Sequence, residues 1–375
     1  MNLGLFPTQQ KKTSTKMGVM TTRQQFPEIP NSKGIKMRNA LPFKPLTTSI
    51  LIAALFSLSN GAMAADSYGI NASKEDKTFT DLTEIKDVDY GIYVSGEHTA
   101  DISSQTDLSI TAKKDGTKFK GGNNNGGKIL LTAGNTLTVT TTAEGIGRGL
   151  RVETNSKNLK ETGITAQAKN IYLTVNSSTN NGNSTANGIC ISGKANSTSP
   201  NKAAGLVTLT AEEQISITTS ADKYSEGISV DGADSSATLT SKNLSIKTLQ
   251  NNNGKHKKGY AHGIISELNG LVDINATESV DIRVTKRGDG EAFALKVVAG
   301  PGWEEYSDRV STIDIQADNI KLNASAETTG NIQTSAIYLL GGRGESDGYD
   351  GPGQGVITLK GKTSTYLRQV ARPVA

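Results

Sequence analysis

The chain has 375 residues, with 40 basic and 36 acidic residues. Residues 1–64 hold eight Lys or Arg and one acidic residue, so residues 65–375 carry 32 basic and 35 acidic residues. This balance argues against binding to nucleic acid or to an acidic membrane surface. The only cysteine is Cys190, which excludes an intramolecular disulfide.

The first predicted element is a secretory leader. A positively charged stretch precedes the apolar run 50–58, and the tripeptide 62–64 (Ala-Met-Ala) has the small-x-small pattern of a cleavage site. The apolar run is too short to span a bilayer. We predict cleavage between Ala64 and Ala65, which makes residues 1–64 the leader. The true start is expected near Met37, and an extended leader that includes 1–36 is the alternative.

Residues 65–367 repeat one phrase, in which a small residue is followed by an apolar, a variable and a second apolar residue. Copies start at Gly91, Gly149, Gly188, Gly227, Gly263, Ala294 and Ala336. From Gly149 onwards the steps between copies are 39, 39, 36, 31 and 42 residues. A repeat of this length predicts one structural unit stacked on copies of itself.

Two further alternating runs follow most copies of the phrase. In the unit that starts at Gly227 they are 237–239 and 244–246. Strict apolar/polar alternation predicts strands with one buried face. The second and third strands are separated by a nearly constant 7 or 8 residues. The spacing from the third strand to the next first strand varies, and we expect the Asn-, Gly- and Lys-rich tracts at that corner.

These units predict an all-β fold, a right-handed parallel β-helix with about three strands per rung and roughly eight rungs. The regular tight turns of a hairpin fold are not evident in the repeat. One rung is expected to begin near Gly116, and residues 68–70 predict an earlier capping turn. The unbroken repeat favours a single solenoid over residues 65–367.

Residues 368–375 lack the alternation of the repeat. We interpret them as an atypical tail and the chain as a truncated piece of a longer protein. Exposed rung edges at such an end permit self-association.

A signal peptide followed by Gly-, Asn-, Ser- and Thr-rich β-solenoid repeats resembles the passenger region of Gram-negative autotransporter adhesins. The resemblance covers roughly residues 65–367. It implies an exported bacterial surface-type adhesin, without catalysis, that presents loops to a host-cell receptor or a glycan. In that family a C-terminal outer-membrane barrel displays the passenger, and residues up to 375 lack the strand series of such a barrel. The expected location is therefore the periplasm or the cell surface, and the outer membrane only if a barrel is supplied.

The tripeptide Arg287-Gly288-Asp289 is one candidate binding site. It lies in a loop just after a third strand, where recognition of a host receptor of the integrin type would need it. A chance occurrence of three common residues is the alternative.

A second candidate is the carboxylate pair Asp273 and Asp314, which occupy the same outward position on the second strands of adjacent units. Such strands lie about 4.8 Å apart. Paired carboxylates on a β-helix can perform acid–base chemistry on polysaccharides. The flanking units have Thr238 and Thr358 there, which favours a solvated polar face.

Two alternatives to the adhesin stay open: a β-helical polysaccharide lyase or hydrolase, and a truncated product without function. An adhesin is expected to expose Thr, Asn and Ser faces, whereas an enzyme needs several converging acids and bases. We expect no cofactor, no metal site and no enzyme activity, because the chain has no phosphate-binding loop and no zinc-ligand spacing. Two tracts are interpreted as solvated loops: the acidic, glycine-rich 341–351 and the basic 255–258.

Overall fold

The computed structural model describes residues 66–121, 126–154, 162–180, 182–193, 205–232, 235–251, 259–298, 310–327, 332–340 and 354–371. The chain divides into two compact units, Met1–Ala62 and Met63–Ala375, and every described residue belongs to the second. The regular elements of that unit are strands. In these ranges no helix has the length and apolar character needed to cross a membrane.

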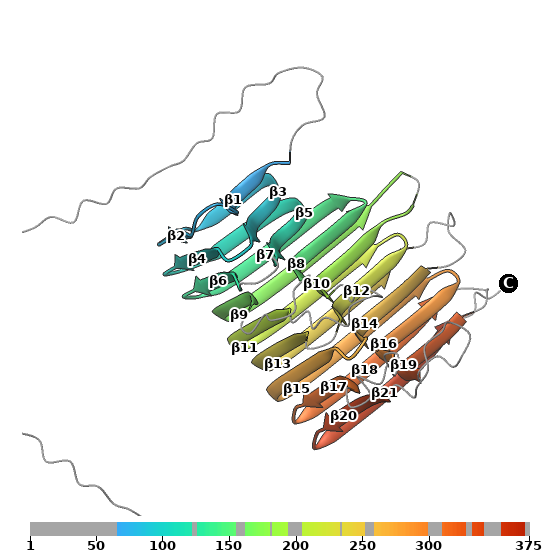
Figure 1. The fold of residues 1–375 in the computed structure, drawn as a ribbon. Coiled ribbons are helices and arrows are strands. Elements are labelled where there is room, and N and C mark those ends of the chain that lie inside the picture. Colours follow the sequence, from blue (N-terminus) through green and yellow to red (C-terminus); the bar gives the residue numbers. More distant parts are fainter. Residues whose placement is uncertain are drawn as a thin grey trace, which may run out of the picture. The chain divides into compact units, whose positions relative to one another are not determined.

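The strands pair in parallel to form three ladders that run the length of the solenoid (Figure 1). The first ladder contains β1 (Tyr68–Ala72), the C-terminal parts of β3 (Glu84–Ser95) and β5 (Leu108–Lys120), β8 (Ile146–Thr154), β10 (Thr185–Gly193), β12 (Tyr224–Asp231), β14 (Gly259–Glu267), β16 (Gly290–Val298) and β19 (Ile332–Leu340).

The second ladder contains β2 (Lys77–Phe79), β4 (Thr99–Ser104), β6 (Lys128–Ala133), the N-terminal halves of β9 (Gly163–Ser178), β11 (Leu206–Ala221), β13 (Ser236–Gln250) and β15 (Leu271–Arg287), and then β17 (Val310–Gln316) and β20 (Gln354–Lys360). The third ladder contains the N-terminal parts of β3 and β5, β7 (Thr136–Glu144), the C-terminal halves of β9, β11, β13 and β15, and then β18 (Asn319–Glu327) and β21 (Thr363–Ala371).

The predicted parallel β-helix with three strands per rung is confirmed. Each ladder holds nine strands in the described residues, so there are nine rungs where roughly eight were expected. The difference lies at 68–70, because the expected capping turn is β1, a full member of the first ladder. At the other end β21 continues to Ala371, so the last strand extends past the expected end of the repeats at 367.

The near-constant spacing of the second and third strands has a simple structural cause. Strands β9, β11, β13 and β15 run through this corner without a loop, and only a register shift marks it, for example between Thr210 and Gln214 of β11. Because the corner lies inside a hydrogen-bonded strand, an insertion there would break the ladder.

The connection from the third strand to the next first strand varies in length as expected, but the longest connections lie at another corner. The long connections 194–205, 299–309 and 341–353 follow the first strand of their rungs and precede the second. The Asn- and Gly-rich tracts 179–184 and 252–258 join a third strand to the next first strand as expected. Insertions are tolerated at the first-to-second corner because the chain leaves the ladders there.

The core consists of aliphatic rows stacked along the axis. Ile189, Ile228 and Ile264 are in register on successive first-ladder strands, and all three are fully buried. Each rung therefore covers the apolar side chains of its neighbours, and this burial stabilises the fold by about 25 cal/mol per Å². Among the described residues, Phe119 is the one aromatic side chain in the buried core cluster.

The first-ladder strands bend sharply, which creates the site described next. Glu291 and Lys296 of β16 are five residues apart, and their charged groups lie 2.8 Å from each other. In a flat strand, residues five apart face opposite sides and lie about 16 Å apart. The bend falls at the small residue of the phrase, where both Gly227 and Ile228 of β12 are buried. Outward side chains on the two arms of the strand therefore converge.

Candidate functional site

The outward side of the first ladder carries charged and aromatic side chains on both arms of the bend. We call this surface the polar stripe. Its two central rows are Tyr68, Tyr90, Asp115, Arg148, Asn187, Glu226, His262 and Phe293, and Tyr93, Lys118, Arg151, Cys190, Ser229, Ile265, Lys296 and Tyr338. Its flanking rows add Tyr224, Tyr260 and Glu291 on one arm, and Glu153, Asp231 and Glu267 on the other.

The outward rows of the second ladder have a different character. The second ladder has threonine or aspartate at one row and threonine, asparagine or glutamine at another. One such row is Thr208, Thr238, Asp273, Asp314 and Thr358. The molecule thus has the Thr/Asn/Ser surfaces expected of an adhesin and also a face on which acids and bases converge.

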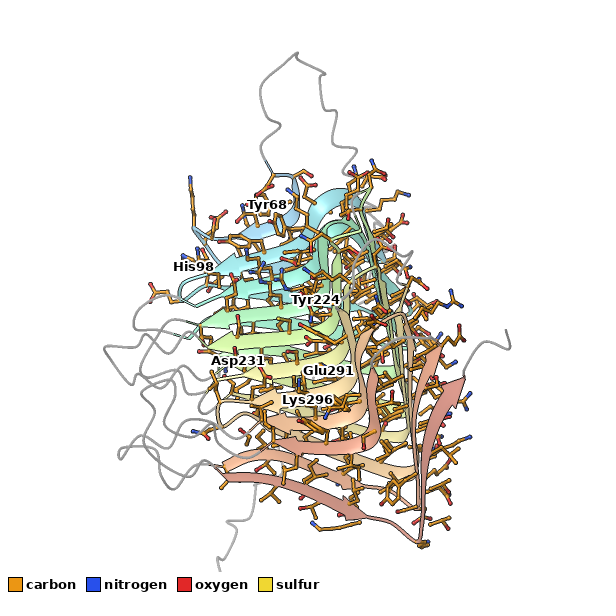
Figure 2. The ribbon with its side chains drawn as sticks, turned by 90° about the vertical axis from the view of Figure 1, so that its right-hand side faces the viewer. Tyr68, His98, Tyr224, Asp231, Glu291 and Lys296 are labelled. Carbon is orange, nitrogen blue, oxygen red and sulfur yellow. The ribbon has the colours of Figure 1, made fainter. Side chains whose placement is uncertain are left out.

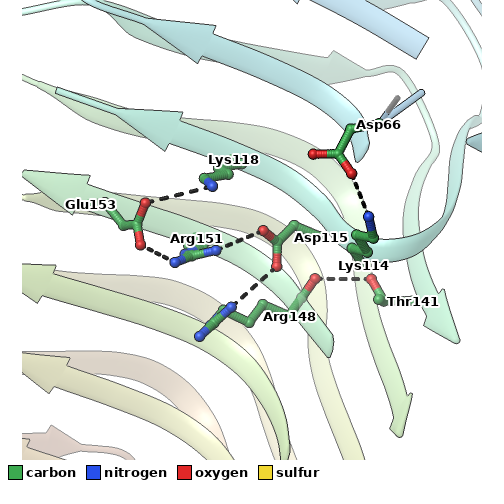
Figure 3. Close-up of polar contacts among 8 residues, drawn as sticks. All are labelled: Asp66, Lys114, Asp115, Lys118, Thr141, Arg148, Arg151 and Glu153. Carbon is green, nitrogen blue, oxygen red and sulfur yellow. Dashed lines mark hydrogen bonds and ion pairs between the residues drawn. The ribbon is translucent and has the colours of Figure 1, made fainter. Parts of the chain in front are cut away.

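A buried ion-pair network forms the middle of the polar stripe (Figure 3). Asp115 of β5 is 1% exposed, and Arg151 Nη1 donates a hydrogen bond of 3.1 Å to its Oδ2. Arg148 Nη1 lies 3.6 Å from Asp115 Oδ1, and Glu153 contacts both Arg151 and Lys118. A buried carboxylate is costly unless it is paired, and the two guanidinium groups supply that pairing. Both carboxylates of the network are therefore paired with basic groups.

Tyrosine rings and lysine ammonium groups lie together at the N-terminal end of the stripe. The ring of Tyr68 lies 5.2 Å from those of Tyr90 and Tyr93. Lys118 Nζ is 5.4 Å from the Tyr90 ring centre, and Lys114 Nζ is 5.6 Å from it. These are distances at which the ring face attracts a cation.

Five rings form a continuous stack at the C-terminal end. Their successive centre-to-centre distances are 4.3, 4.5, 5.7 and 4.4 Å for Tyr224, Tyr260, His262, Phe293 and Tyr338. Rungs repeat at about 4.8 Å, close to the separation at which rings stack, so the ladder register orders the contacts of Tyr224 with Tyr260 and of His262 with Phe293. Tyr260 and His262 lie on one strand, and Tyr338 reaches Phe293 from the other arm of the bend. Figure 2 shows Tyr224, Glu291 and Lys296 along this face.

His262 lies between two carboxylates of the neighbouring rungs. The residue is 1% exposed, with Nδ1 3.6 Å from Glu226 Oε1 and Nε2 3.4 Å from Glu291 Oε2. The contact with His262, together with Lys296, lowers the pKa of Glu291 to about 2. Asn187 Nδ2 donates a hydrogen bond of 2.5 Å to Glu226 Oε2.

Asp231 and Glu267 are the exception to this pairing. They are in register on β12 and β14, one rung apart. Burial, followed by repulsion from Glu267 and Glu226, raises the pKa of Asp231 to about 6. Burial also raises the pKa of Glu267. In the part of the chain that the structure describes, neither forms an ion pair, and Asp231 Oδ1 is shielded from solvent without a hydrogen-bond partner.

Cys190 lies in the stripe between Arg151 and Ser229. Burial raises the pKa of its thiol, despite the nearby Arg148. A raised thiol pKa disfavours the nucleophilic thiolate. The geometry therefore does not activate this cysteine.

The structure places the tripeptide Arg287-Gly288-Asp289 at the turn between β15 and β16. Gly288 has a φ of 88°, in the left-handed region that favours glycine. The Arg287 side chain is 53% exposed, and its Nε lies 3.2 Å from Glu327 Oε2 of the next rung. Its Nη1 donates a hydrogen bond of 3.2 Å to Asn251 Oδ1. Arg287 is therefore exposed, whereas Gly288 and Asp289 are half-buried, and the guanidinium is held by the solenoid.

The predicted register of Asp273 and Asp314 is confirmed, with Thr238 and Thr358 on either side. Asp314 also forms an ion pair of 3.4 Å with Lys360. Among the described residues there is no group of three acidic, His or Cys side chains able to hold a metal ion. The predicted cleavage site Ala64/Ala65 and the tracts 255–258 and 341–351 lie outside those residues.

The polar stripe was not identified from the sequence, although a signal for it exists. The residue that precedes the small residue of each phrase is charged, aromatic, His or Asn in every unit from Gly91 to Ala294. Comparison with protein-family models, with curated proteins and with solved structures finds no match to this chain. The argument for function therefore rests on the geometry of the stripe.

Proposed function

We propose that the chain is an exported, bacterial surface-type adhesin that binds an extended glycan along the polar stripe, without catalysis. The predicted leader supports export to the periplasm or cell surface. The observation that carries the proposal is the concentration of rings and hydrogen-bonding groups on one of three faces, in rows that cross successive rungs. Ligand sites typically combine aromatic surface with a few placed polar groups.

A solenoid suits a polymeric ligand because its surface repeats. Tyr224 and Tyr260 are in register one rung apart, and the stack continues to Tyr338 of β19. Tyrosine offers an apolar face together with a polar hydroxyl, which matches the amphipathic surface of a sugar ring. A chain of sugars lying along the axis would meet one such group after another.

Removing a ring from the stripe tests the proposal. We expect Tyr224→Ala to weaken binding to the best ligand of an oligosaccharide array by about tenfold, or 1.4 kcal/mol. Tyr172→Ala is the matched control, because Tyr172 is a half-buried, outward tyrosine on the third ladder. Thermal unfolding of both variants reports whether they remain folded. Equal losses in the two variants, or no oligosaccharide bound by the wild type, would contradict the proposal.

A second candidate function is cleavage of the bound polysaccharide, as in a β-helical lyase or hydrolase. It is favoured by the convergence of Glu226, His262 and Glu291 beside Lys296, since acid–base catalysis needs such groups within reach of one substrate. Incubation of the folded protein with bound oligosaccharides and analysis of their length distinguishes the two functions. An adhesin leaves the oligosaccharides intact.

Host-receptor binding through the Arg287-Gly288-Asp289 turn is a separate proposal. It is supported by the exposure of Arg287 at the turn between β15 and β16. If cell adhesion does not decrease with Asp289→Glu, the turn has no such role.

A further inference from the structure

We infer that the C-terminal part of the polar stripe recognises the protonated amino groups of an amino-sugar polymer, with Asp231 and Glu267 as the carboxylates that bind an ammonium group. The inference rests on the proposed glycan binding and names the class of glycan. It makes the stripe selective for free-amine hexosamine units over their N-acetylated forms.

The chain's own lysines show how this face binds an ammonium group. Lys296 Nζ lies 2.8 Å from Glu291 Oε2 and 5.7 Å from the ring centre of Phe293. At the other end Lys114 contacts Asp66 and lies 5.6 Å from the ring of Tyr90. In both places one ammonium group is held by a carboxylate and an aromatic ring together. This combination attracts cations through charge and through the ring quadrupole.

The same combination recurs at Asp231 and Glu267 without a lysine. Both carboxylates are partly exposed, so that a ligand can reach them, and they lie in register on adjacent rungs. Across the described ranges, neither has a basic side chain at ion-pair distance, and Asp231 Oδ1 lacks a hydrogen-bond partner. Two half-buried carboxylates in register on strands about 4.8 Å apart repel each other, and a cation placed between them removes that repulsion.

Aromatic surface adjoins these carboxylates. Burial and the nearby charges of Glu226 and Glu267 raise the pKa of the Tyr260 hydroxyl, and the ring of Tyr260 stacks on that of Tyr224 at 4.3 Å. Lys223 Nζ already lies 4.6 Å from the centre of the Tyr224 ring, which shows that the end of the stack accepts an ammonium group. A sugar ring that stacks here would bring its amino substituent towards the carboxylates.

The charges around the pair leave an acidic excess. The groups facing Asp231 and Glu267 from neighbouring strands are Glu226, His262, Glu291 and Lys296. Lys296 and His262 both contact Glu291, and His262 also contacts Glu226. Even with His262 protonated, four carboxylates face two cations. Such a surface raises the local concentration of a cationic ligand.

Calorimetric titration of the exported chain with a glucosamine oligosaccharide and with its fully N-acetylated counterpart tests the inference. We expect the free-amine oligomer to bind at least about tenfold more tightly, a difference of 1.4 kcal/mol. The double variant Asp231→Asn/Glu267→Gln should abolish this preference, so that it binds the two oligomers with equal affinity. The control Asp273→Asn/Asp314→Asn alters an equivalent in-register pair on the second ladder and should keep the preference.

The outcomes separate the inference from the proposal on which it rests. Equal affinity for the two oligomers would overturn the amino-group recognition and support glycan binding. Amino-group recognition is also overturned, and glycan binding still supported, if neither oligomer binds while other oligosaccharides bind at Tyr224. If no oligosaccharide binds, the proposed function fails as well. Loss of the preference in the control pair would show a general charge effect and overturn the assignment to Asp231 and Glu267.

Discussion

Carboxylates within one stripe differ in protonation because their partners differ. Glu291 contacts His262 and Lys296, and its pKa falls to about 2. Asp231 is partly buried without a basic partner among the described residues, and its pKa rises to about 6. The two groups therefore have opposite effects on stability: pairing makes one charge favourable to folding, whereas burial makes the other unfavourable.

The Asp231 carboxylate is expected to lower the stability of the wild type at neutral pH. The folded protein holds the Asp231 proton more tightly than the unfolded chain, whose value is near 3.8, so the stabilising contribution of the protonated group is lost as pH rises from about 4 to about 6. Asp231→Asn should increase the free energy of unfolding at pH 7 by about 1–2 kcal/mol. The gain should vanish below the unfolded-state value.

Urea unfolding of the wild type and of Asp231→Asn, at pH 7 and at a pH below 3.8, measures this difference in the free energy of unfolding. Asp273→Asn is the control, because Asp273 lies on the second ladder away from the acidic pair, and its effect should stay within about 0.5 kcal/mol. A gain of equal size at both pH values would show that the effect does not come from titration of Asp231.

Alternation in the sequence was sufficient to predict which residues face outwards. The register of Asp273 with Asp314 followed from it. The period of two fixes the face to which a side chain points, and the repeat of the rung fixes which residue lies beside it on the next rung. The contact between Glu291 and Lys296 did not follow, because it depends on the bend within the strand. No local pattern gives the angle of that bend, which is set by packing against the third ladder.

At the level of the strand, the small residue of the phrase permits this bend. A Cβ atom on Gly227 would lie 2.5 Å from the carbonyl oxygen of Gly263 and closer still to Cγ2 of Ile246. A Cβ atom on Gly188 would likewise overlap with Cγ2 of Ile217, and one on Gly263 would overlap with Cγ2 of Ile282. Glycine is thus required where the first ladder approaches a β-branched side chain of the third.

Two described rungs bury alanine at this position, Ala294 in β16 and Ala336 in β19, and the first of them supports the explanation. Ala294 is fully buried in β16, and the third-ladder residue of that rung is Leu322, in register with Ile282. Leucine has no methyl group on its Cβ atom, so the space that Cγ2 of isoleucine fills is open to the alanine methyl. The small residue of the first ladder and the facing residue of the third ladder therefore differ together in this rung.

Gly227→Ala is expected to lower the free energy of unfolding by about 1–3 kcal/mol, because it overpacks this contact. Adding Ile246→Leu should recover part of the loss, which a double-mutant cycle measured by urea unfolding will show. Ser229→Ala, on the outward side of the same strand, is the control and should change little. If the two single effects simply add, the contact with Ile246 does not determine the need for glycine.

The repeat predicted the three strands of each rung, since periodicity is a local property. It did not predict that the long connections follow the first strand. Their place depends on which corner lies outside the ladders, and the connection 299–309 shows no alternation that would reveal it. Strand type and order were therefore accessible from the sequence, whereas the corner that tolerates insertions was not.

At the scale of the whole solenoid, its last rung exposes the side chains that other rungs bury. In the last described rung Ile337 is 36% exposed, Leu339 53% and Tyr366 47%, although their equivalents in the preceding rung, Leu295, Val297 and Leu322, are fully buried. Among the described residues, β19, β20 and β21 each pair with one strand. Unpaired edges beside apolar surface favour association with another chain.

We expect the protein to self-associate through this rung as its concentration rises. Leu339→Lys should shift sedimentation-velocity profiles towards the monomer, because a charge at the edge opposes strand pairing. Leu271→Lys is the control, since Leu271 is 39% exposed on an internal strand of the second ladder. A concentration-independent monomer in the wild type would contradict this expectation.

The central claim is that one face of the solenoid, the polar stripe, is the binding surface. Hydroxyl-radical footprinting of the protein with and without its tightest array oligosaccharide tests this claim directly, because tyrosines occur on more than one face. We expect protection of Tyr224, Tyr260 and Tyr338 of the first ladder and unchanged labelling of Tyr172 on the third. Protection of Tyr172 with unchanged labelling of the three stripe tyrosines would contradict the claim.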